Sequence, residues 1–562
     1  MPQLRIRHLT FRAGSRPGAT PLSVDIPHVT VLVGPNNSGK SITLGELEVW
    51  CQGENPAFKI LASADLLMPD SFGELLAMIK VHEAPPPDGY MPSSDHFWVS
   101  RPVIRQGEHA LHDQISERFL RECFNDKSEQ QLRQAFVKLY TLRLDGRTRF
   151  DLVDPKETGP LEVPPRNHLW ALFVSDSSRE KVRQFTEDAF GRHFVVDPTG
   201  MTEFRVRLSD RKPQNKAEEQ ALDATARAFH QAAPLIPELG DGVRTSVGLV
   251  SAVMSVPHRI LLIDEPEAFL HPTLARRVGT VLSATARDRE ASLIVATHSA
   301  DFLMGCILAT PELRIVRLTY TSGSPTARSI EPTEIIGLMN DPLLRSANAL
   351  RALFHQAVIV TEADADRALY EEVNYRLQQA NRGTNDALFM NAQNWQTIPR
   401  IVSPLRKLGI PAAAIFDFDV LMDENFSHIW PLLNLPDERL KPLQANRNTI
   451  KGYLEAKTRS VCKAQGLGAL TGVELAEVTA FINRMKEYGL FFVTVGELEC
   501  WLSALGIPRT ASKPKWLTDM FTRMGADPAA ADYVVAGNDD IWTFLEDIAT
   551  WLNNPDRLGI PD

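Results

Sequence analysis

The stretch Gly34-Pro35-Asn36-Asn37-Ser38-Gly39-Lys40-Ser41 decides the fold of the first half of this chain. It fits the phosphate-loop pattern of glycine, four residues and then Gly-Lys-Ser/Thr. An apolar run of strand type, 29–33, precedes it, and a helical pattern follows over 42–50. In such a turn the backbone N–H groups point inward, beside the positive end of the following helix. The pattern predicts a nucleoside triphosphate site, with Lys40 on the β- and γ-phosphates and Ser41 on Mg²⁺.

Length and composition set the frame for this site. The chain has 562 residues, of which 44% are hydrophobic and 23% charged, which is typical of a globular protein with two or three domains. The net charge of −10 argues against a protein that coats nucleic acid, so any such contact must use local patches. The five cysteines show no C-x-x-C pairing, which favours a reducing, cytoplasmic location over a disulfide framework or a zinc site.

Neither a membrane segment nor a signal peptide is expected. No apolar run approaches the roughly 18 residues that a membrane helix needs. The first residues, 1–11, alternate charged and apolar side chains like a strand and do not resemble a signal peptide.

Two further apolar runs end in polar side chains that suit triphosphate hydrolysis. Ile260-Leu-Leu-Ile precedes Asp264, which would hold Mg²⁺, and Glu265, which would orient and polarise the attacking water. The run 293–296 precedes His298, which can hydrogen-bond a γ-phosphate. The turn Gly240-Asp241-Gly242 opens a predicted helix and suits a phosphate approaching from outside. A plain helix-start turn explains these glycines equally well.

The segments between these motifs have readable patterns. The sequence predicts helices over 110–142, a β-hairpin over 142–154 around Asp145-Gly146, a pair of strands over 194–208, and a linker over 323–333. A second series then alternates strands with helices, which indicates a parallel sheet. Its expected elements are the strands 357–360 and 412–416 and the helices 365–379 and 397–408.

The motifs GPNNSGKS, LGDGV, ILLIDEPEAFLHP and ATHSADFL, in this order, resemble the ABC-type ATPase heads of the SMC, RecF and OLD (overcoming lysogenisation defect) proteins. The EPEAFLHP and THSADFL forms look most like the OLD group. The resemblance covers about 1–335 and implies an ATP- and Mg²⁺-binding head with an elaborated insertion at about 105–235. It also implies a homodimer or higher oligomer, in which one subunit supplies Lys40 and Glu265 and another the 240–242 turn. Gln106 is an open candidate for the Q-loop glutamine.

Acidic residues also follow apolar runs in the second half of the chain. They are Glu362, Asp364 and Asp366, then Asp417 and Asp419, then Glu497 and Glu499. The carboxyl ends of parallel strands converge, and residues i and i+2 of an extended strand point the same way, so that Asp417 and Asp419 could share one metal. Oxygen-only ligation favours Mg²⁺ or Mn²⁺. The plainer alternatives are dipole stabilisation at a helix start and a solvated loop.

The pattern of Glu362 and Asp417-x-Asp419 resembles the TOPRIM domain of topoisomerases, primases and OLD nucleases, over about 350–505. Asp366 and Glu499 match further acids of OLD-type members, and 506–562 would form a helical C-terminal extension. Ala363 departs from the family, which usually has glycine there. An ATPase followed by a TOPRIM domain is the arrangement of OLD-family nucleases, including the nuclease subunit of the Gabija antiphage system.

A local excess of basic residues is a candidate DNA surface, although a solvated helix face is an equal alternative. These residues are Arg447, Lys451, Lys457, Arg459 and Lys463, with Tyr453 among them. Further on, Lys513 and Lys515 could place a charge near a scissile phosphate.

The sequence therefore predicts an α/β protein, an ABC-type head with a helical insertion followed by a TOPRIM-like parallel sheet. The expected function is an ATP-controlled, divalent-metal-dependent endonuclease acting on DNA in antiphage or antiplasmid defence, together with a partner protein of such a system. Two alternatives stay open. One is a nucleotide-switched scaffold or sensor whose degenerate TOPRIM site controls a partner effector, and the other is a nuclease for RNA such as tRNA.

Overall fold

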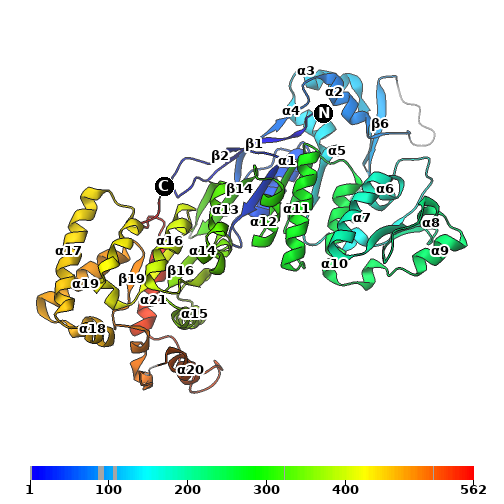
Figure 1. Cartoon of the computed structure of the whole chain (residues 1–562). Helices are drawn as coiled ribbons and strands as arrows, with labels where there is room; N and C mark the ends of the chain where they lie inside the picture. The colour runs from blue at the N-terminus through cyan, green and yellow to red at the C-terminus, as the bar shows by residue number, and fades with distance from the viewer. Residues whose placement is uncertain (1–2, 87–93, 105–110, 322, 510–511, 562) are drawn as a thin grey trace. The chain divides into compact units, whose positions relative to one another are not determined.

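A computed structural model describes the chain except for residues 1–2, 87–93, 105–110, 322, 510–511 and 562 (Figure 1). The described chain divides into two compact units. The first comprises 1–14, 20–33 and 39–318, and the second comprises 15–19, 34–38 and 319–562. Among the described residues, no helix has the length and apolar character needed to cross a bilayer.

The largest sheet has six strands in the order β15-β14-β3-β13-β12-β8, and the first unit contains β3, β8, β12, β13 and most of β14. Its strands are β3 (Val29–Val33), β8 (Thr141–Leu144), β12 (Ile260–Asp264), β13 (Ser292–Ala296), β14 (Arg314–Thr321) and β15 (Ser324–Ile330). The strands from β14 to β8 run parallel, and β3, β12 and β13 are buried throughout. Burial on both faces explains their almost uninterrupted apolar sequences.

Four helices follow the motif-bearing strands and turns. They are α1 (Lys40–Cys51), α10 (Asp241–Ser255), α11 (Pro272–Asp288) and α12 (Ala300–Ala309). Helices α11 and α12 touch through their backbones, since a Cβ atom on Gly305 would lie 2.0 Å from the carbonyl oxygen of Arg276, and one on Gly279 would lie 2.4 Å from that of Phe302. Only glycine allows so close an approach.

The rest of the first unit consists of three small antiparallel sheets and further helices. The strands form the orders β2-β1-β4, β5-β6-β7 and β10-β11-β9. Their bounds are β1 (Arg5–Phe11), β2 (Ser23–Asp25), β4 (Leu61–Leu67), β5 (Glu83–Ala84), β6 (His96–Arg101), β7 (Leu111–Ser116), β9 (Lys156–Glu157), β10 (His193–Asp197) and β11 (Glu203–Ser209). The helices are α2 (Phe72–Lys80), α3 (Glu117–Asn125), α4 (Glu129–Leu132), α5 (Lys138–Tyr140), α6 (His168–Val174), α7 (Asp176–Phe190), α8 (Lys216–Gln220) and α9 (Ala224–Gln231). The predicted strand pair over 194–208 is confirmed as β10 and β11.

Two predicted elements are wrong, and the helical prediction over 110–142 is wrong in part, because Leu111–Ser116 forms β7, which pairs with β6. The residues 142–154 do not form a hairpin, because β8 pairs in parallel with β12 and 150–153 form a 3₁₀ turn. The Asp145 carboxylate accepts the backbone N–H groups of Arg147 and Thr148 at 3.0 and 3.2 Å, which ends the strand. The expected linker 323–333 instead contains β15, whose position at the sheet edge tolerates Pro325.

A four-stranded parallel sheet organises the second unit, in the order β17-β16-β18-β19, and confirms the predicted alternation. The strands are β16 (Ala357–Thr361), β17 (Ala387–Asn391), β18 (Ala412–Phe416) and β19 (Leu490–Phe492). The helices are α13 (Pro332–Asn340), α14 (Pro342–Ser346), α15 (Asp364–Gln379), α16 (Ile398–Lys407), α17 (Asp437–Glu455), α18 (Arg459–Gln465), α19 (Gly472–Lys486), α20 (Lys513–Met524) and α21 (Asp540–Asn553).

The last two helices belong to the core of this second sheet. Trp516 of α20 and Trp542 of α21 are buried in one cluster with Ile359 and Ile415 of the central strands. Helices α20 and α21 therefore pack against the sheet, and this packing fixes the place of the first residue of α20 in the unit.

Candidate active sites

The first site lies at the carboxyl edge of three neighbouring strands. Because β3, β13 and β12 are adjacent and parallel, the glycine-rich loop, the 297–299 turn and the 264–265 pair leave the sheet side by side. Gly34 and Gly39 of the loop have φ values of 140° and 96°, a region that favours glycine. Within the first unit, this places Lys40 and Ser41 in one region with the predicted acids Asp264 and Glu265.

Lys40 is buried at the start of α1, and Ser41 is exposed beside it. Burial lowers the pKa of Lys40 to about 8, while the nearby charges of Glu265 and Asp264 oppose the change. A desolvated ammonium group gains from a phosphate that approaches it, since opposite charges interact strongly where water is excluded. The loop asparagines Asn36 and Asn37 are exposed, whereas Pro35 and Ser38 are buried.

Two arginines hold Asp264. The Arg143 guanidinium donates to Asp264 Oδ2 at 3.2 Å, and the Arg149 guanidinium donates to the Asp264 carbonyl oxygen. Asp264 Oδ1 is buried and has no hydrogen-bond partner among the described residues. One carboxylate oxygen is thus fixed by an arginine while the other is left for a cation, as expected of a Mg²⁺ ligand.

The sequence interpretation missed both arginines because it placed them in a β-hairpin. A usable signal was present, since Arg143 interrupts a short apolar strand in which every residue is buried. A charged residue in such a strand needs a partner, and here that partner is the acid at the end of the adjacent strand β12.

Glu265 and His298 are neighbours, as the prediction requires. The carboxylate Oε1 of Glu265 lies 3.8 Å from His298 Nε2. Glu265 has a φ of 47° and a half-exposed side chain, and its N–H donates to the carbonyl of Ala296 at 2.7 Å. The backbone N–H of His298 donates at 2.7 Å to Glu267, an acid whose pKa burial raises. Glu267 therefore positions the histidine turn, and the strained backbone of Glu265 is typical of a functional site.

The 240–242 turn caps α10. Gly240 is the N-cap residue and has an ordinary φ of −63°. A Cβ atom on Gly242 would lie 3.1 Å from the carbonyl oxygen of Phe269, so the turn packs beside the loop that follows Glu265. Its predicted role with Asp241 toward a second subunit's nucleotide stays a prediction. The Q-loop candidate Gln106 lies outside the described residues.

The second site lies at the carboxyl edge of the second sheet. Glu362 follows β16, Asp417 follows the adjacent β18, and Glu499 follows β19. Asp366 stands on the first turn of α15, directly after Glu362. Asp366, Asp417 and Glu499 are buried, and Glu362 is partly buried.

These acids repel one another. Burial, followed by the charges of Asp366 and Glu362, raises the pKa of Asp417 well above its ordinary value. Burial and the charge of Asp366 likewise raise the pKa of Glu362. Groups that interact in this way are close in space, so the structure brings together acids that are separate in the sequence.

The local geometry corrects one argument. Asp417 is not part of an extended strand, because β18 ends at Phe416 and a 3₁₀ helix begins at Phe418. Asp419 lies inside that helix, and Glu499 lies in another 3₁₀ helix, so the rule for alternate residues of a strand does not apply. The helix-start alternative for Asp366 is partly correct, since its Oδ2 accepts the N–H of Ala363 at 3.0 Å.

A lysine from a distant part of the chain enters this cluster. The charges of Asp366, Asp417, Glu499 and Glu362 raise the pKa of Lys513 against the opposing effect of its burial. Lys513 is the first residue of α20, so the helix packing described above determines its place. The sequence suggested a charge here but could not fix its position.

The oxygen atoms of these acids suit a hard cation, although the side chains do not surround one common position. The ligands are oxygens only, and Glu499 Oε2 is buried with no hydrogen-bond partner among the described residues. In the described ranges, no group of three or more His, Cys, Asp and Glu side chains has a geometry that could hold a metal ion. A cation would have to draw these carboxylates closer together.

The candidate DNA surface over 447–463 is largely neutralised. Arg459 donates to Asp419 Oδ2 at 2.7 Å, and Lys463 lies 3.8 Å from the same oxygen. The other basic residues pair in the same way, Lys451 with Glu424, Lys457 with Glu474, and Arg447 with the carbonyl of Asp423. The Tyr453 hydroxyl donates to Glu477 at 3.0 Å. These cations orient acids, including Asp419, and do not form a free basic face.

Comparison with known families covers both halves of the chain. Residues 121–305 match the family described as "AAA domain, putative AbiEii toxin, Type IV TA system". Residues 353–419 match the family "Overcoming lysogenization defect protein-like, TOPRIM domain". These two domain types support ATPase and phosphodiesterase chemistry, and they confirm the predicted order of an ATPase head and a TOPRIM domain.

Individual relatives are more distant. The phosphonates import ATP-binding protein PhnC of Hyphomonas neptunium is 34% identical over 82 residues, which is 15% of this chain and 31% of that protein. The chain thus spans about a third of the length of this curated relative. The SMC head domain from Thermotoga maritima is 16% identical and matches 58% of this chain and 99% of its own, with a TM-score of 0.30. CbiO1 from Clostridium perfringens is 12% identical and matches 61% of this chain and 95% of its own, with a TM-score of 0.28. Because these TM-scores are low, the fold assignment rests on the two family matches.

Proposed function

Because the chain joins an AAA-type ATPase domain to an OLD-like TOPRIM domain, the fusion typical of the OLD family, we propose that it is an ATP-controlled, divalent-metal-dependent endonuclease. DNA is the proposed substrate, and the proposed setting is cytoplasmic antiphage or antiplasmid defence with a partner protein. The setting rests on the resemblance to OLD proteins.

The cluster of buried acids carries this proposal. Glu362, Asp366, Asp417 and Glu499 repel one another at one sheet edge, and a hard divalent cation would relieve that repulsion. When bound, Mg²⁺ or Mn²⁺ would activate water and stabilise the leaving oxygen of a phosphodiester. Asp419 would assist, with its carboxylate oriented by the ion pair with Arg459. Lys513 would place an ammonium group beside the reacting phosphate.

In the first unit, the proposed roles follow the geometry around Asp264. Lys40 would bind the β- and γ-phosphates, Ser41 and Asp264 the Mg²⁺ ion, and Glu265 the attacking water, with His298 on the γ-phosphate. A dimer would complete the site with the 240–242 turn of a second subunit. ATP would then control the nuclease through the arrangement of the two heads.

The test measures cleavage of single- and double-stranded DNA and of tRNA by the purified protein with Mg²⁺ or Mn²⁺. Each reaction is run with ATP, with ADP and without nucleotide. We expect metal-dependent cleavage of DNA at rates that differ between the nucleotides. Equal rates in all three would refute the nucleotide control, and cleavage of tRNA alone would favour the RNA alternative.

A second candidate function is a nucleotide-switched scaffold, and two observations favour it. Ala363 replaces the usual family glycine, and within the described residues the acids do not form a metal-holding group. If the protein shows no cleavage with any metal while Asp417→Ala keeps the biological effect, the scaffold is correct.

A further inference from the structure

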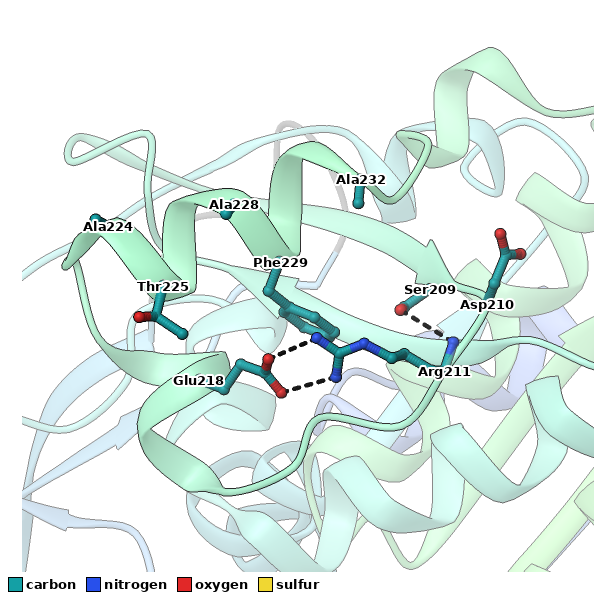
Figure 2. A pocket seen from close by; sticks show the side chains of 9 residues that line it. All are labelled: Ser209, Asp210, Arg211, Glu218, Ala224, Thr225, Ala228, Phe229 and Ala232. Atoms are coloured by element: carbon teal, nitrogen blue, oxygen red, sulfur yellow. Dashed lines mark hydrogen bonds and ion pairs between the residues drawn. The ribbon is translucent and has the colours of Figure 1, made fainter.

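Two pockets of the described chain differ in the state of their arginines. Figure 2 shows the first, in the insertion of the first unit, where the Arg211 guanidinium donates two hydrogen bonds to Glu218 and lies 4.8 Å from the Phe229 ring centre. Its arginine is already neutralised. The second pocket has a volume of about 320 Å³ and lies within the second unit.

This second pocket adjoins the cluster of acids. It is lined by Asn391 at the end of β17 and by Gln393, and β17 pairs with β16, the strand that leads to Glu362. Asn391 Nδ2 donates to Asp364 Oδ1 at 3.1 Å. The carboxyl edge of the sheet thus changes from acids at β16 and β18 to neutral amides at β17.

Two arginines line the same pocket. Arg367 is held by Asp364 at 2.8 Å and by Glu371 at 2.7 Å. Arg351 is exposed, and within the described part of the chain its guanidinium has no hydrogen-bond or ion-pair partner. The pocket therefore offers one fixed and one available guanidinium group, which is the group best suited to phosphate oxygens.

The backbone around the pocket is also unusual. Asn348 and Gln393 line it with φ values of 55° and 70°. A positive φ is uncommon for residues other than glycine, and asparagine adopts it more readily than glutamine. Both amide side chains are exposed, so they can donate to and accept from a ligand.

From these observations we propose that this pocket is a nucleotide subsite of the nuclease. It would hold the nucleotide next to the scissile phosphate, with Arg351 on a backbone phosphate and Gln393 and Asn348 on the base. The volume suits a ligand at the small end of the range for binding pockets, as one nucleotide is. This inference rests on the proposed nuclease function.

The electrostatics explain why such a subsite is needed. The edge formed by Glu362 and Asp417 repels a phosphodiester backbone, and the nearby cations Arg459 and Lys463 are engaged by Asp419. Arg351 supplies a charge that the substrate can neutralise. A strand anchored there is drawn across the acids toward the reacting position.

The experiment compares Arg351→Glu with the matched control Arg439→Glu, which reverses an exposed arginine on α17 outside the pocket. Binding of a fluorescent single-stranded oligonucleotide is measured by anisotropy over a salt series, and KM and kcat are measured for cleavage. We expect Arg351→Glu to raise Kd and KM about tenfold or more, with little change in kcat, and to lower the salt slope by about 1. The control should behave as wild type.

Two further variants keep the proposal open to refutation. Arg351→Lys should restore part of the binding, and Gln393→Ala should weaken it about threefold to tenfold and alter the base preference beside the cut. An unchanged unfolding temperature shows that each variant is folded. Wild-type Kd and KM in Arg351→Glu, in a protein that still cleaves, would overturn the subsite alone. A wild-type protein that neither binds nor cleaves nucleic acid would overturn the nuclease proposal as well.

Discussion

The two sheet edges of this protein have the same topology and opposite electrostatics. At the first edge, Arg143 and Arg149 hold Asp264, and Lys40 is buried beside it. At the second edge, Asp417 and its neighbouring acids repel one another, and Lys513 is the cation placed among them. The charges at the first edge favour an anion that binds together with a metal ion, whereas the charges at the second edge favour a cation.

This difference shows how one chain can handle phosphate in two ways. The carboxyl ends of parallel strands provide the position in both cases, and the surrounding charges decide which ligand is stable there. Under the proposed function, Lys40 with its lowered pKa would bind a phosphate, and Asp417 with its raised pKa would bind a metal. Each site is therefore destabilised until its own ligand arrives, and variants that remove one charge should affect one edge only.

Asp417→Ala should have the largest effect. We expect nucleic acid cleavage to fall about 10³-fold, since a bound metal contributes several kcal/mol and each 1.4 kcal/mol corresponds to a factor of ten. ATP hydrolysis should be unchanged. The control is Asp437→Ala, an exposed acid on α17. Wild-type cleavage by Asp417→Ala would break the comparison, because the second edge would then not be the cation site.

Lys40→Ala should give the next largest effect and the reverse pattern. Loss of the ammonium group should lower ATP hydrolysis about 10²-fold. This is the usual effect of removing one hydrogen-bond donor that stabilises the charge developing in the transition state. Cleavage should persist but lose its response to nucleotide. Parallel assays of phosphate release and cleavage test this, and unaltered control by ATP would show that the first edge does not govern the second.

Arg143→Ala sharpens the description of the first edge. Without the Arg143 guanidinium, the Asp264 side chain should be less well oriented. ATP hydrolysis should therefore fall about tenfold, the usual effect of losing a group that orients a metal ligand. Extra Mg²⁺ should recover part of the loss. Arg147→Ala, an exposed arginine in the following turn, serves as the control. Equal activities of the two variants would deny Arg143 this role.

The smallest effect concerns the stability of the metal-free protein. The pKa of Asp417 is raised in the folded state, so the folded form binds more protons, and stability falls as the pH rises from about 4 toward the folded pKa. We therefore expect a fall in pH to stabilise the wild-type protein more than Asp417→Asn, so that the unfolding temperature of the variant rises less on acidification. Calorimetry in EDTA measures this, and Mg²⁺ should abolish the difference. An identical pH dependence in wild type and Asp417→Asn would contradict it.

Much of this architecture could be predicted from local sequence. The loop ending in Lys40, the pair Asp264-Glu265 and the acids at 362 and 417 all stand where an apolar run ends, and such runs form strands whose order brings the acids together. The second parallel sheet follows from the same pattern. These candidate functional residues lie in short segments, so the local sequence is sufficient to identify them.

The rest depends on contacts between distant parts of the chain. Arg149 meets the carbonyl of a residue 115 positions away, and Lys513 reaches the acids because its helix joins the core of the sheet. The basic run 447–463 resembled a surface for DNA, but its partners Asp419, Glu424 and Glu474 come from other segments. Local patterns cannot show whether a charge is already paired.

The contact between α11 and α12 has one more consequence. Gly279 and Gly305 leave no space between the two backbones, so we expect the two helices to move together. α11 follows the loop of Glu265, and α12 follows the turn of His298. Under the proposed function, a displacement of either residue on loss of the terminal phosphate would pass to both helices together, each of which is about 15 Å or more long.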